Sequence, residues 1–344
     1  MQVASFCTHY IHSFAQKFGK LDIAHVNMSD YARRYLLHLQ RHHLYYLAIY
    51  ADVLEEVMQQ SDKNAGDIRL VDYGAGNGLL GIFARHCGFH TVIICDQDKD
   101  FIRSARMLAL ALQVYPDEFI SGDITDLLSR GHKNLVDAVV GTDVIEHIYN
   151  LDDFFGSVQE LNPAMITVFT TASNPNNYFK LQQLKKIQLK DELEGSDPAD
   201  FALAGAEKHI SFLEMRRNII TDNFLAITGD ELTKLATATR GLHHLDIIKS
   251  VSHYKETGEL PVPPARVSNT CNPETGSWTE RVLSISDYRT IYSRYGFELF
   301  VKAGFYNSYT SGFKKFPNLF RNILVKLTGS VTAPFITLSA RKSK

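Results

Sequence analysis

Residues 70–81, LVDYGAGNGLLG, lead from an apolar run through three glycines into a predicted helix. Gly74, Gly76 and Gly78 alternate with other residues here, and glycine lets the backbone adopt positive φ angles and approach a ligand closely. The N-terminus of the helix that follows offers free N–H groups and the positive end of the helix dipole. A strand, a glycine turn and a helix in this order are typical of a nucleotide-binding element.

The spacing of the glycines distinguishes two classes of ligand. A dinucleotide-binding turn reads G-x-G-x-x-G, but Leu79 occupies the position of its third glycine. Asp72 stands two residues before Gly74 and would add negative charge beside a pyrophosphate, whereas it suits a ligand with an ammonium group. The turn therefore favours a cationic ligand over a dinucleotide.

Short apolar strands and helices alternate for about 100 residues from this turn onward, which predicts a parallel, doubly wound α/β sheet. Ligands of such sheets bind outside the carboxyl ends of the strands. We expect strands at 68–73, 91–95, 118–120, 136–141 and 164–170, with helices at 79–86, 99–112 and 152–161. The chain is expected to return to the sheet through a helix at 286–294, a strand at 297–305, a helix at 315–327 and a strand at 334–341.

Two helical parts accompany the expected sheet domain, which comprises residues 67–171 and 284–344. Residues 1–66 are predicted to form an N-terminal helical cap, in which Ser29 is a good N-cap and a tyrosine-rich run over 31–60 contains no Gly or Pro. This run either packs on the sheet or closes over the ligand as a lid.

The second helical part is an insertion at 172–283, after the fifth strand. It is expected to contain helices at 178–193, 207–222 and 232–239, and a capping box joins Thr228 to Glu231 before the last of these. An insertion of this length is where we expect substrate specificity to be built.

Composition limits the class of protein. A net charge of −2 over 344 residues lacks the basic excess typical of nucleic-acid binding, so we expect no nucleic-acid partner. The four cysteines form no C-x-x-C pair, which argues against a zinc framework or a disulfide scaffold.

The first 20 residues contain no long apolar run, and no segment is long enough to span a bilayer, so we expect a cytoplasmic location. The amphipathic helix at 315–327 either packs under the terminal strands or contacts a membrane.

Several motifs together resemble the S-adenosylmethionine (SAM)-dependent methyltransferases with a class I, Rossmann-like fold. The D-x-G-x-G-x-G of residues 72–78 resembles their first motif, Asp96 ends the second predicted strand, and Gly122-Asp123 follows the third. The piece TDVIEHI, residues 142–148, is closest to the ubiquinone-biosynthesis type of small-molecule O-methyltransferase. The segments at 286–299 and 333–342 look like the helix and terminal hairpin of such enzymes. The resemblance covers about residues 68–171 and 284–342 and implies a seven-stranded, mostly parallel sheet with a terminal antiparallel hairpin.

The resemblance implies SAM as the cofactor and S-adenosylhomocysteine (SAH) as its product. Asp72 would hold the methionyl ammonium, and Asp96 would accept both ribose hydroxyls, since a carboxylate has two oxygens for two donors. Asp98 is a weaker rival for the ribose. Asp123 and the backbone N–H of Ile124 would bind the adenine. The full set of expected cofactor-binding residues is Asp72, Gly74, Ala75, Gly76, Gly78, Asp96, Gln97, Asp123, Ile124, Thr142 and Asp143.

Methyl transfer asks little chemistry of the protein, because the sulfonium is already activated and the enzyme mainly aligns the reactants and excludes water. A hydroxyl acceptor needs a base, and His147 is the candidate, since it follows the fourth strand and titrates near neutral pH. A divalent ion held by Asp143, Glu146 and His147 is an alternative that the motif suggests, although we expect no metal.

The sequence thus predicts a SAM-dependent methyltransferase acting on a small molecule, more readily at oxygen than at nitrogen or carbon. A protein-modifying methyltransferase, a non-catalytic nucleotide-binding scaffold and an NAD-dependent oxidoreductase are the alternatives. Asp72, Asp96 and Asp123 argue against the scaffold, and Leu79 argues against the oxidoreductase. Residues of the insertion that either contact the acceptor or are structural are His209, Arg216, Trp278, Glu280 and Arg281.

Overall fold

The computed structural model describes residues 6–195, 210–309 and 315–343. The chain divides into two compact units. The first comprises Met1–Ile145, Leu151–Ala172 and Ile285–Lys344, and the second comprises Glu146–Asn150 and Ser173–Ser284.

The first unit contains a seven-stranded sheet in the order β3-β2-β1-β4-β5-β7-β6. The strands are β1 (Arg69–Tyr73), β2 (Thr91–Asp96), β3 (Glu118–Ser121), β4 (Ala138–Thr142), β5 (Ile166–Thr171), β6 (Phe297–Ala303) and β7 (Ile336–Lys342). Strands β1 to β5 pair in parallel, and β7 runs antiparallel to both β5 and β6. This arrangement confirms the predicted sheet with its terminal antiparallel hairpin.

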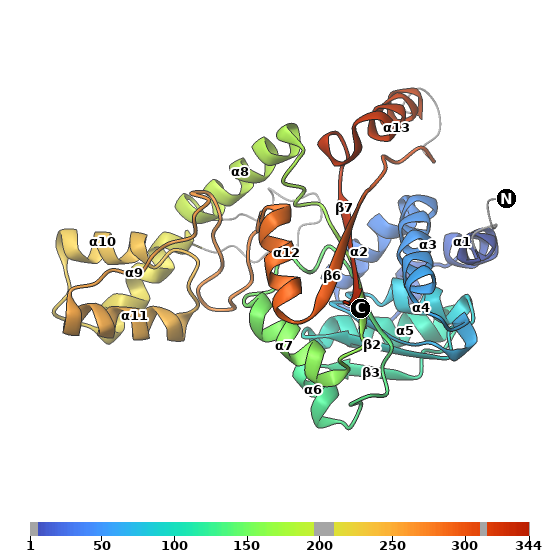
Figure 1. The fold of residues 1–344 in the computed structure, drawn as a ribbon, viewed down its shortest axis with the longest axis horizontal. Helices are drawn as coiled ribbons and strands as arrows, with labels where there is room; N and C mark the ends of the chain where they lie inside the picture. Colours follow the sequence, from blue (N-terminus) through green and yellow to red (C-terminus); the bar gives the residue numbers. More distant parts are fainter. Residues whose placement is uncertain (1–5, 196–209, 310–314, 344) are drawn as a thin grey trace. The chain divides into compact units, whose positions relative to one another are not determined.

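Helices cover both faces of the sheet, as Figure 1 shows for α3, α4 and α5 on one face and α6, α7 and α12 on the other. The helices that connect the strands are α4 (Leu79–His86), α5 (Lys99–Leu112), α6 (Ile124–Ser129), α7 (Leu151–Leu161) and α12 (Ile285–Arg294). The bounds of α4 and α5 coincide with the predicted ones, whereas α6 was not predicted. A further helix, α13 (Lys315–Thr328), lies between β6 and β7.

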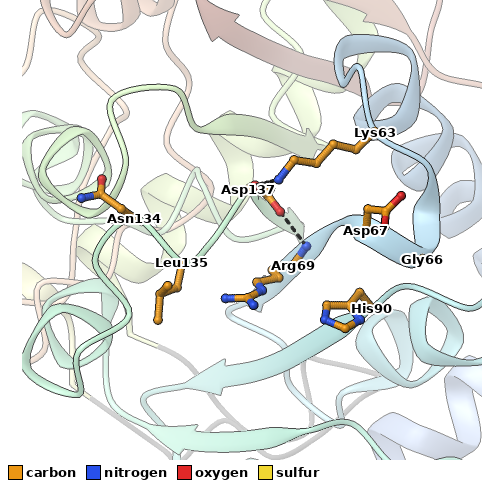
Figure 2. Close-up of a pocket in the computed structure, with 8 residues that line it drawn as sticks. All are labelled: Lys63, Gly66, Asp67, Arg69, His90, Asn134, Leu135 and Asp137. Atoms are coloured by element: carbon orange, nitrogen blue, oxygen red, sulfur yellow. Dashed lines mark hydrogen bonds and ion pairs between the residues drawn. The ribbon is translucent and has the colours of Figure 1, made fainter.

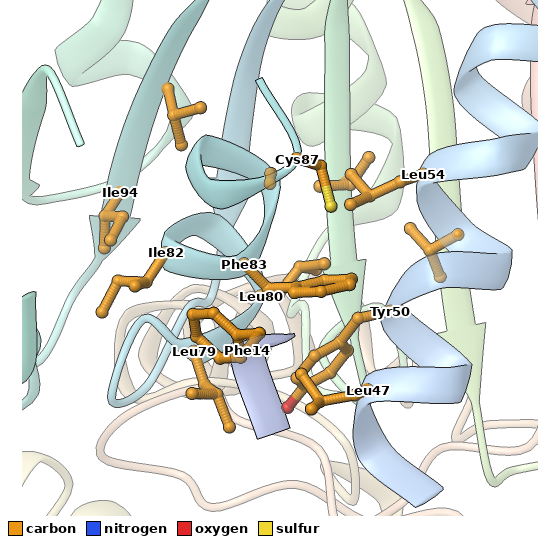
Figure 3. Packing of buried hydrophobic residues seen from close by; sticks show 14 of the residues in the cluster. Phe14, Leu47, Tyr50, Leu54, Leu79, Leu80, Ile82, Phe83, Cys87 and Ile94 are labelled. Atoms are coloured by element: carbon orange, nitrogen blue, oxygen red, sulfur yellow. The ribbon is translucent and has the colours of Figure 1, made fainter. Parts of the chain in front are cut away.

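The N-terminal helices belong to the core of the first unit. They are α1 (Ile11–Gly19), α2 (Asp30–Arg41) and α3 (His43–Gln60), and the side chain of Ser29 caps α2 as predicted. Figure 3 shows Phe14 of α1 and Leu47 and Leu54 of α3 packed against Phe83 of α4, and all four are buried. Burial of a side chain of this size stabilises a fold by about 1.5–3 kcal/mol.

The prediction of one continuous helix over 31–60 is wrong at one residue, His42. His42 has φ −117° and ψ 25°, which lies outside the helical region and separates α2 from α3. The side chain of the next residue, His43, bonds the carbonyl of Gln40 through Nδ1 at 2.7 Å. This bond uses a carbonyl at the end of α2, as side chains near helix termini commonly do.

The second unit is mainly helical, as predicted. It contains α8 (Tyr178–Leu193), α9 (Phe212–Asn223), α10 (Gly229–Ala238) and α11 (His244–Thr257), of which α11 was not predicted. The bounds of α8 coincide with the predicted ones, and residues 207–209 of the expected second helix lie outside the described residues. A small core joins α9, α10 and α11 through Ile219, Ile220, Leu235, Ile247 and Val251.

The capping box expected between Thr228 and Glu231 is wrong. The Thr228 side chain makes no capping hydrogen bond, although Thr228 is the N-cap residue of α10. Gly229, which follows it, has φ +58°. A capping box needs a helical first turn, so this backbone conformation removes its geometry.

No helix among the described residues has the length and apolar character needed to cross a bilayer.

Candidate functional site

The glycine turn is closely packed on one side and open on the other. Gly74, Gly76 and Gly78 have φ angles of +63°, +53° and +70°. A Cβ added at Gly74 would lie 2.2 Å from Cγ2 of Val144, so a side chain there cannot fit. A Cβ at Gly76 would meet only the ring of Tyr35, at 3.5 Å. The open side at Gly76 is where the turn can receive a ligand.

Asp72 lies under this turn, at the end of β1. Its side chain is 1% exposed, and Oδ2 accepts a hydrogen bond of 2.8 Å from the N–H of Gly81 in α4. Burial raises the pKa of Asp72 to about 7, the Gly81 bond opposes this rise, and the charge of Asp96 adds to it. A cation beside Asp72 would favour its ionised form.

Asp96 is the last residue of β2, and its side chain is hydrogen-bonded to the glycine turn that follows the neighbouring strand, β1. Its Oδ2 accepts from Gly76 N–H at 2.7 Å, and its Oδ1 accepts from Asp98 N–H at 2.8 Å. Burial raises the pKa of Asp96, while these two bonds lower it. Each carboxylate oxygen accepts more than one hydrogen bond, so Asp96 keeps capacity for two ribose hydroxyls.

Asp98 and Asp123 are helix caps. Asp98 accepts from Asp100 N–H at 2.7 Å at the start of α5, which accounts for its side chain without a ligand. Asp123 accepts from the N–H of Thr125 at 2.7 Å and from its hydroxyl at 2.6 Å, at the start of α6. Ile124, the first residue of α6, has no intrahelical acceptor for its N–H. Asp123 therefore caps a helix, which the sequence did not predict because α6 has only six residues.

The end of β4 holds Thr142 and Asp143. Asp143 has φ +51°, which is unusual for a residue other than glycine and costs about 1 kcal/mol or more. Its N–H donates to the carbonyl of Thr170 at 3.0 Å, and its Oδ1 accepts from Ala172 N–H at 3.2 Å. These bonds hold the strained turn at the same edge of the sheet as Asp72 and Asp96. Gln97, also expected near the cofactor, is exposed.

Helix α2 is attached to the glycine turn. The buried Asn77 donates to the carbonyl of Ala32 at 3.1 Å. The rings of Tyr31 and Tyr35 lie 5.3 and 5.9 Å from that of Phe101 in α5. Sequence reasoning noted the tyrosines of this helix but not Asn77, which a single sequence does not distinguish from any turn asparagine. The lid function of α2 stays a prediction.

The charge at this edge is negative. Burial and then the charge of Asp143 raise the pKa of Tyr35, and the charge of Asp72 acts in the same direction. Burial likewise raises the pKa of Tyr31, with contributions from Asp98 and Asp96. Such a field attracts a cationic group and repels a pyrophosphate.

A second site lies within the second unit, around His147. A cavity of about 300 Å³ is lined by His147, Ile187, Asp191, Phe212, Asn272, Thr275, Ser277, Trp278, Thr279 and Glu280. Nδ1 of His147 lies 2.7 Å from the carbonyl of Trp278. A carbonyl only accepts, so Nδ1 carries the proton and Nε2 of the neutral ring is left as the basic nitrogen.

Hydrogen bonds fix the segment that carries His147 to the far end of the insertion. Trp278 donates from its backbone to the carbonyl of His147 at 3.3 Å and from Nε1 to that of Tyr149 at 3.0 Å. The N–H of Arg281 donates to the carbonyl of Glu146 at 3.2 Å, and its guanidinium lies 4.3 Å from the ring of Trp278.

Buried polar side chains hold the backbone that lines the cavity. Gln188 donates to the carbonyls of Thr279 and Glu280 at 3.1 and 2.7 Å. Arg216 is fully buried and bonds Glu192 at 2.5 and 3.1 Å and the carbonyl of Ala236 at 2.7 Å. Arg216 therefore joins α8, α9 and α10 and is not an acceptor contact, whereas Trp278 and Glu280 line the cavity. His209 lies outside the described residues.

Another cavity, of about 280 Å³, lies at the amino ends of β1 and β4 (Figure 2). Asp137 in its wall bonds Lys63 at 2.7 Å and the N–H of Arg69 at 2.9 Å. This is the edge opposite the glycine turn, and it contains none of the predicted site residues. In the described part of the chain, no three His, Cys, Asp or Glu side chains are grouped so as to hold a metal ion.

Comparisons with known proteins find similarity to solved structures. No family model and no curated protein matches the chain. Among solved structures, the chain is similar to the magnesium protoporphyrin IX methyltransferase of Synechocystis with bound SAH, at 13% identity and a TM-score of 0.39 over 98% of this chain and 97% of that one. It is similar to a SAM-dependent methyltransferase of Mesorhizobium loti at 14% identity and a TM-score of 0.38, over 83% of this chain and 95% of that one.

The chain is also similar to the bifunctional kinase-methyltransferase WbdD, at 19% identity and a TM-score of 0.31 over 38% of this chain, but it covers only 30% of WbdD. Because these TM-scores are below 0.5, the fold assignment depends on the strand order of this chain. The seven-stranded, mostly parallel sheet with its terminal antiparallel hairpin is the sheet that the resemblance to the class I SAM-dependent methyltransferases implies. The resemblance is thus confirmed as a fold, and the ubiquinone type stays a prediction.

Proposed function

We propose that this protein is a SAM-dependent methyltransferase that binds its cofactor at the glycine turn of the first unit. The observation that carries the proposal is the position of Asp72 and Asp96 around a turn that is open at Gly76. Burial raises the pKa of Asp72 to about 7, and a cation beside this carboxyl would stabilise its ionised form. SAM carries two cationic groups, an ammonium and a sulfonium. The residues present therefore fit this cofactor better than a dinucleotide.

The expected residues other than Gln97 each have a role in this proposal. Asp72 holds the ammonium, the backbone of 74–78 packs against the methionyl part, and Asp96 accepts the ribose hydroxyls. Asp123 and Ile124 bind the adenine, and Thr142 and Asp143 border the sulfonium. When bound, SAM supplies an activated methyl group, so the protein has only to align the acceptor and exclude water.

The cavity of the second unit is proposed to take the acceptor, a small molecule that receives the methyl group on a hydroxyl oxygen. Its volume of about 300 Å³ is at the lower end for small-molecule sites. His147 would take the hydroxyl proton at Nε2, while its Nδ1–H donates to the carbonyl of Trp278. Methylation of nitrogen or carbon, or of a protein, is the alternative. No residue of the cavity specifically favours it.

A binding titration tests the cofactor. Purified protein titrated by calorimetry is expected to bind SAM and SAH at one site per chain and not to bind NAD. The variant Asp96→Ala is expected to lose about tenfold or more in affinity, because it removes charged acceptors from the ribose. Asp62→Ala, which changes an exposed carboxylate, is the control and is expected to bind as the original protein does. Binding of NAD without SAM would favour the oxidoreductase, and binding of neither ligand would refute the proposed methyltransferase.

A transfer assay tests His147. Methyl-labelled SAM incubated with a small-molecule cell extract is expected to give a labelled product. His147→Asn keeps a donor for the Trp278 carbonyl but cannot take a proton, so transfer is expected to fall about 10²–10⁴-fold with SAM binding unchanged. His253→Asn makes the same change at an exposed histidine of the same unit and should leave transfer intact. Full transfer by His147→Asn would refute the role of His147 as the base.

A further inference from the structure

Helix α13 presents its apolar side chains to the outside. Phe316, Leu319, Phe320, Ile323 and Leu327 recur at helical spacing along one face. All five are exposed, Phe320 to 62% and Leu327 to 77%. Packing of this face under the terminal strands, one of the two expectations from the sequence, is therefore wrong. An exposed apolar face of this kind marks an interaction site on a folded protein.

The opposite face of α13 attaches the helix to the first unit through polar contacts. Asn322 accepts from the N–H of Tyr306 at 2.7 Å and donates to its carbonyl at 3.0 Å. Asn318 donates to the carbonyl of Asn307 at 2.7 Å, and Val325 is buried on this side. These contacts fix which face of α13 turns outward.

The part of the sequence that carries α13 has only positive charges. Residues 299–344 contain eight Lys and Arg and no Asp or Glu. Since the whole chain has a net charge of −2, residues 1–298 carry −10. On the helix itself, Lys315 and Lys326 adjoin the apolar face and are exposed, and the guanidinium of Arg321 lies 5.4 Å from the ring of Tyr306. An apolar face bordered by cations is complementary to an anionic lipid surface, where each cation contributes about a fivefold gain in affinity.

The sheet register places α13 at the edge where the proposed cofactor site lies. Ile336, the first residue of β7, pairs with Thr171 at the end of β5 and with Ala303 at the end of β6. The segment from β6 to β7, which contains α13, therefore leaves and rejoins the sheet at the carboxyl ends of the parallel strands (Figure 1).

We propose that α13 docks the protein on an anionic membrane surface through Phe316, Leu319, Phe320, Ile323 and Leu327, with Lys315 and Lys326 on the lipid headgroups. Apolar side chains would enter the boundary of headgroups and acyl chains, as in other interfacial helices. The proposal concerns a surface and does not depend on methyl transfer.

Vesicle co-sedimentation tests the proposal. The full chain is expected to sediment with vesicles of phosphatidylcholine and phosphatidylglycerol, and about tenfold or more less with phosphatidylcholine alone. Phe320→Glu with Ile323→Glu is expected to abolish binding, because it places two carboxylates on the face that enters the lipid. Lys315→Gln with Lys326→Gln is expected to weaken binding to the anionic vesicles about tenfold or more and to leave the neutral ones unaffected.

The matched control is Leu225→Glu with Val262→Glu, which adds the same charges at two apolar side chains exposed to 84% and 91% in the second unit. This variant is expected to bind vesicles nearly as the original protein does, and circular dichroism checks that both double variants fold. Equal binding by the two double variants would overturn the proposal. So would a dimer in sedimentation analysis that Phe320→Glu with Ile323→Glu dissociates, because a second copy would then cover this face.

Discussion

Replacement of Asp72 with Asn is expected to lower the affinity for SAM and SAH by about 10- to 100-fold. Asn keeps an oxygen for the Gly81 N–H but loses the charge that would hold the methionyl ammonium, and hydrogen bonds between charged groups are worth about 1.5–3 kcal/mol. Calorimetry measures the loss. 5′-Methylthioadenosine, which lacks the ammonium, is the control ligand and is expected to bind both proteins equally.

The same residue makes binding depend on pH. The ammonium binds ionised Asp72. Because burial raises the pKa of Asp72 to about 7, the affinity of the original protein should rise by up to about tenfold per pH unit as the pH approaches 7 from below, and the gain from ionising Asp72 should be complete above it. Stability changes in the opposite direction. Protonated Asp72 favours the folded state, so this contribution is complete below pH 4 and is lost as the pH rises through about 7. In Asp72→Asn both dependences should disappear, and a pH-dependent affinity that persists in this variant would assign it to another group.

Replacement of Gly74 with Ala is expected to destabilise the first unit by about 3 kcal/mol or more. The new Cβ would stand 2.2 Å from Cγ2 and 2.9 Å from Cβ of Val144, at a backbone φ of +63°. Overpacking and a positive φ each cost about 1–3 kcal/mol. Urea unfolding followed by circular dichroism measures the change.

Gly76→Ala is the matched control for this prediction. Its φ of +53° carries a similar backbone cost, but its Cβ would meet only Tyr35 at 3.5 Å, so a loss of about 1 kcal/mol is expected. Adding Val144→Ala to Gly74→Ala removes Cγ2, the atom of Val144 in closest contact, leaves the Cβ contact at 2.9 Å, and should recover part of the loss. Equal destabilisation by the two glycine variants would contradict the packing described for this turn.

Local patterns predicted much of the sheet unit. Helices α4 and α5 begin and end at the residues predicted from their apolar patterns. The acidic residues at the ends of β1 and β2 could be placed together because parallel strands end at a common edge. Neither inference needs knowledge of distant contacts.

What sequence reasoning missed depends on short elements or long-range contacts. Helix α6 has six residues, too few to show a periodic pattern, and the break at His42 has no Gly or Pro to mark it. The hydrogen bond between Asn77 and Ala32 joins residues 45 positions apart, and no pattern in the neighbouring sequence indicates it. The exposed face of α13 could not be foreseen because amphipathicity does not say what covers a helix.

The loop after β4 has a consequence for the design of chimaeras. Residues Glu146–Asn150 belong to the compact unit of the insertion, although they lie 23 positions or more before Ser173, where its main segment begins. Their carbonyls receive hydrogen bonds from Trp278 and Arg281. A graft that exchanges only residues 173–284 with those of another protein would leave these carbonyls next to a foreign sequence. The transferable module is discontinuous, and a working hybrid must carry both pieces.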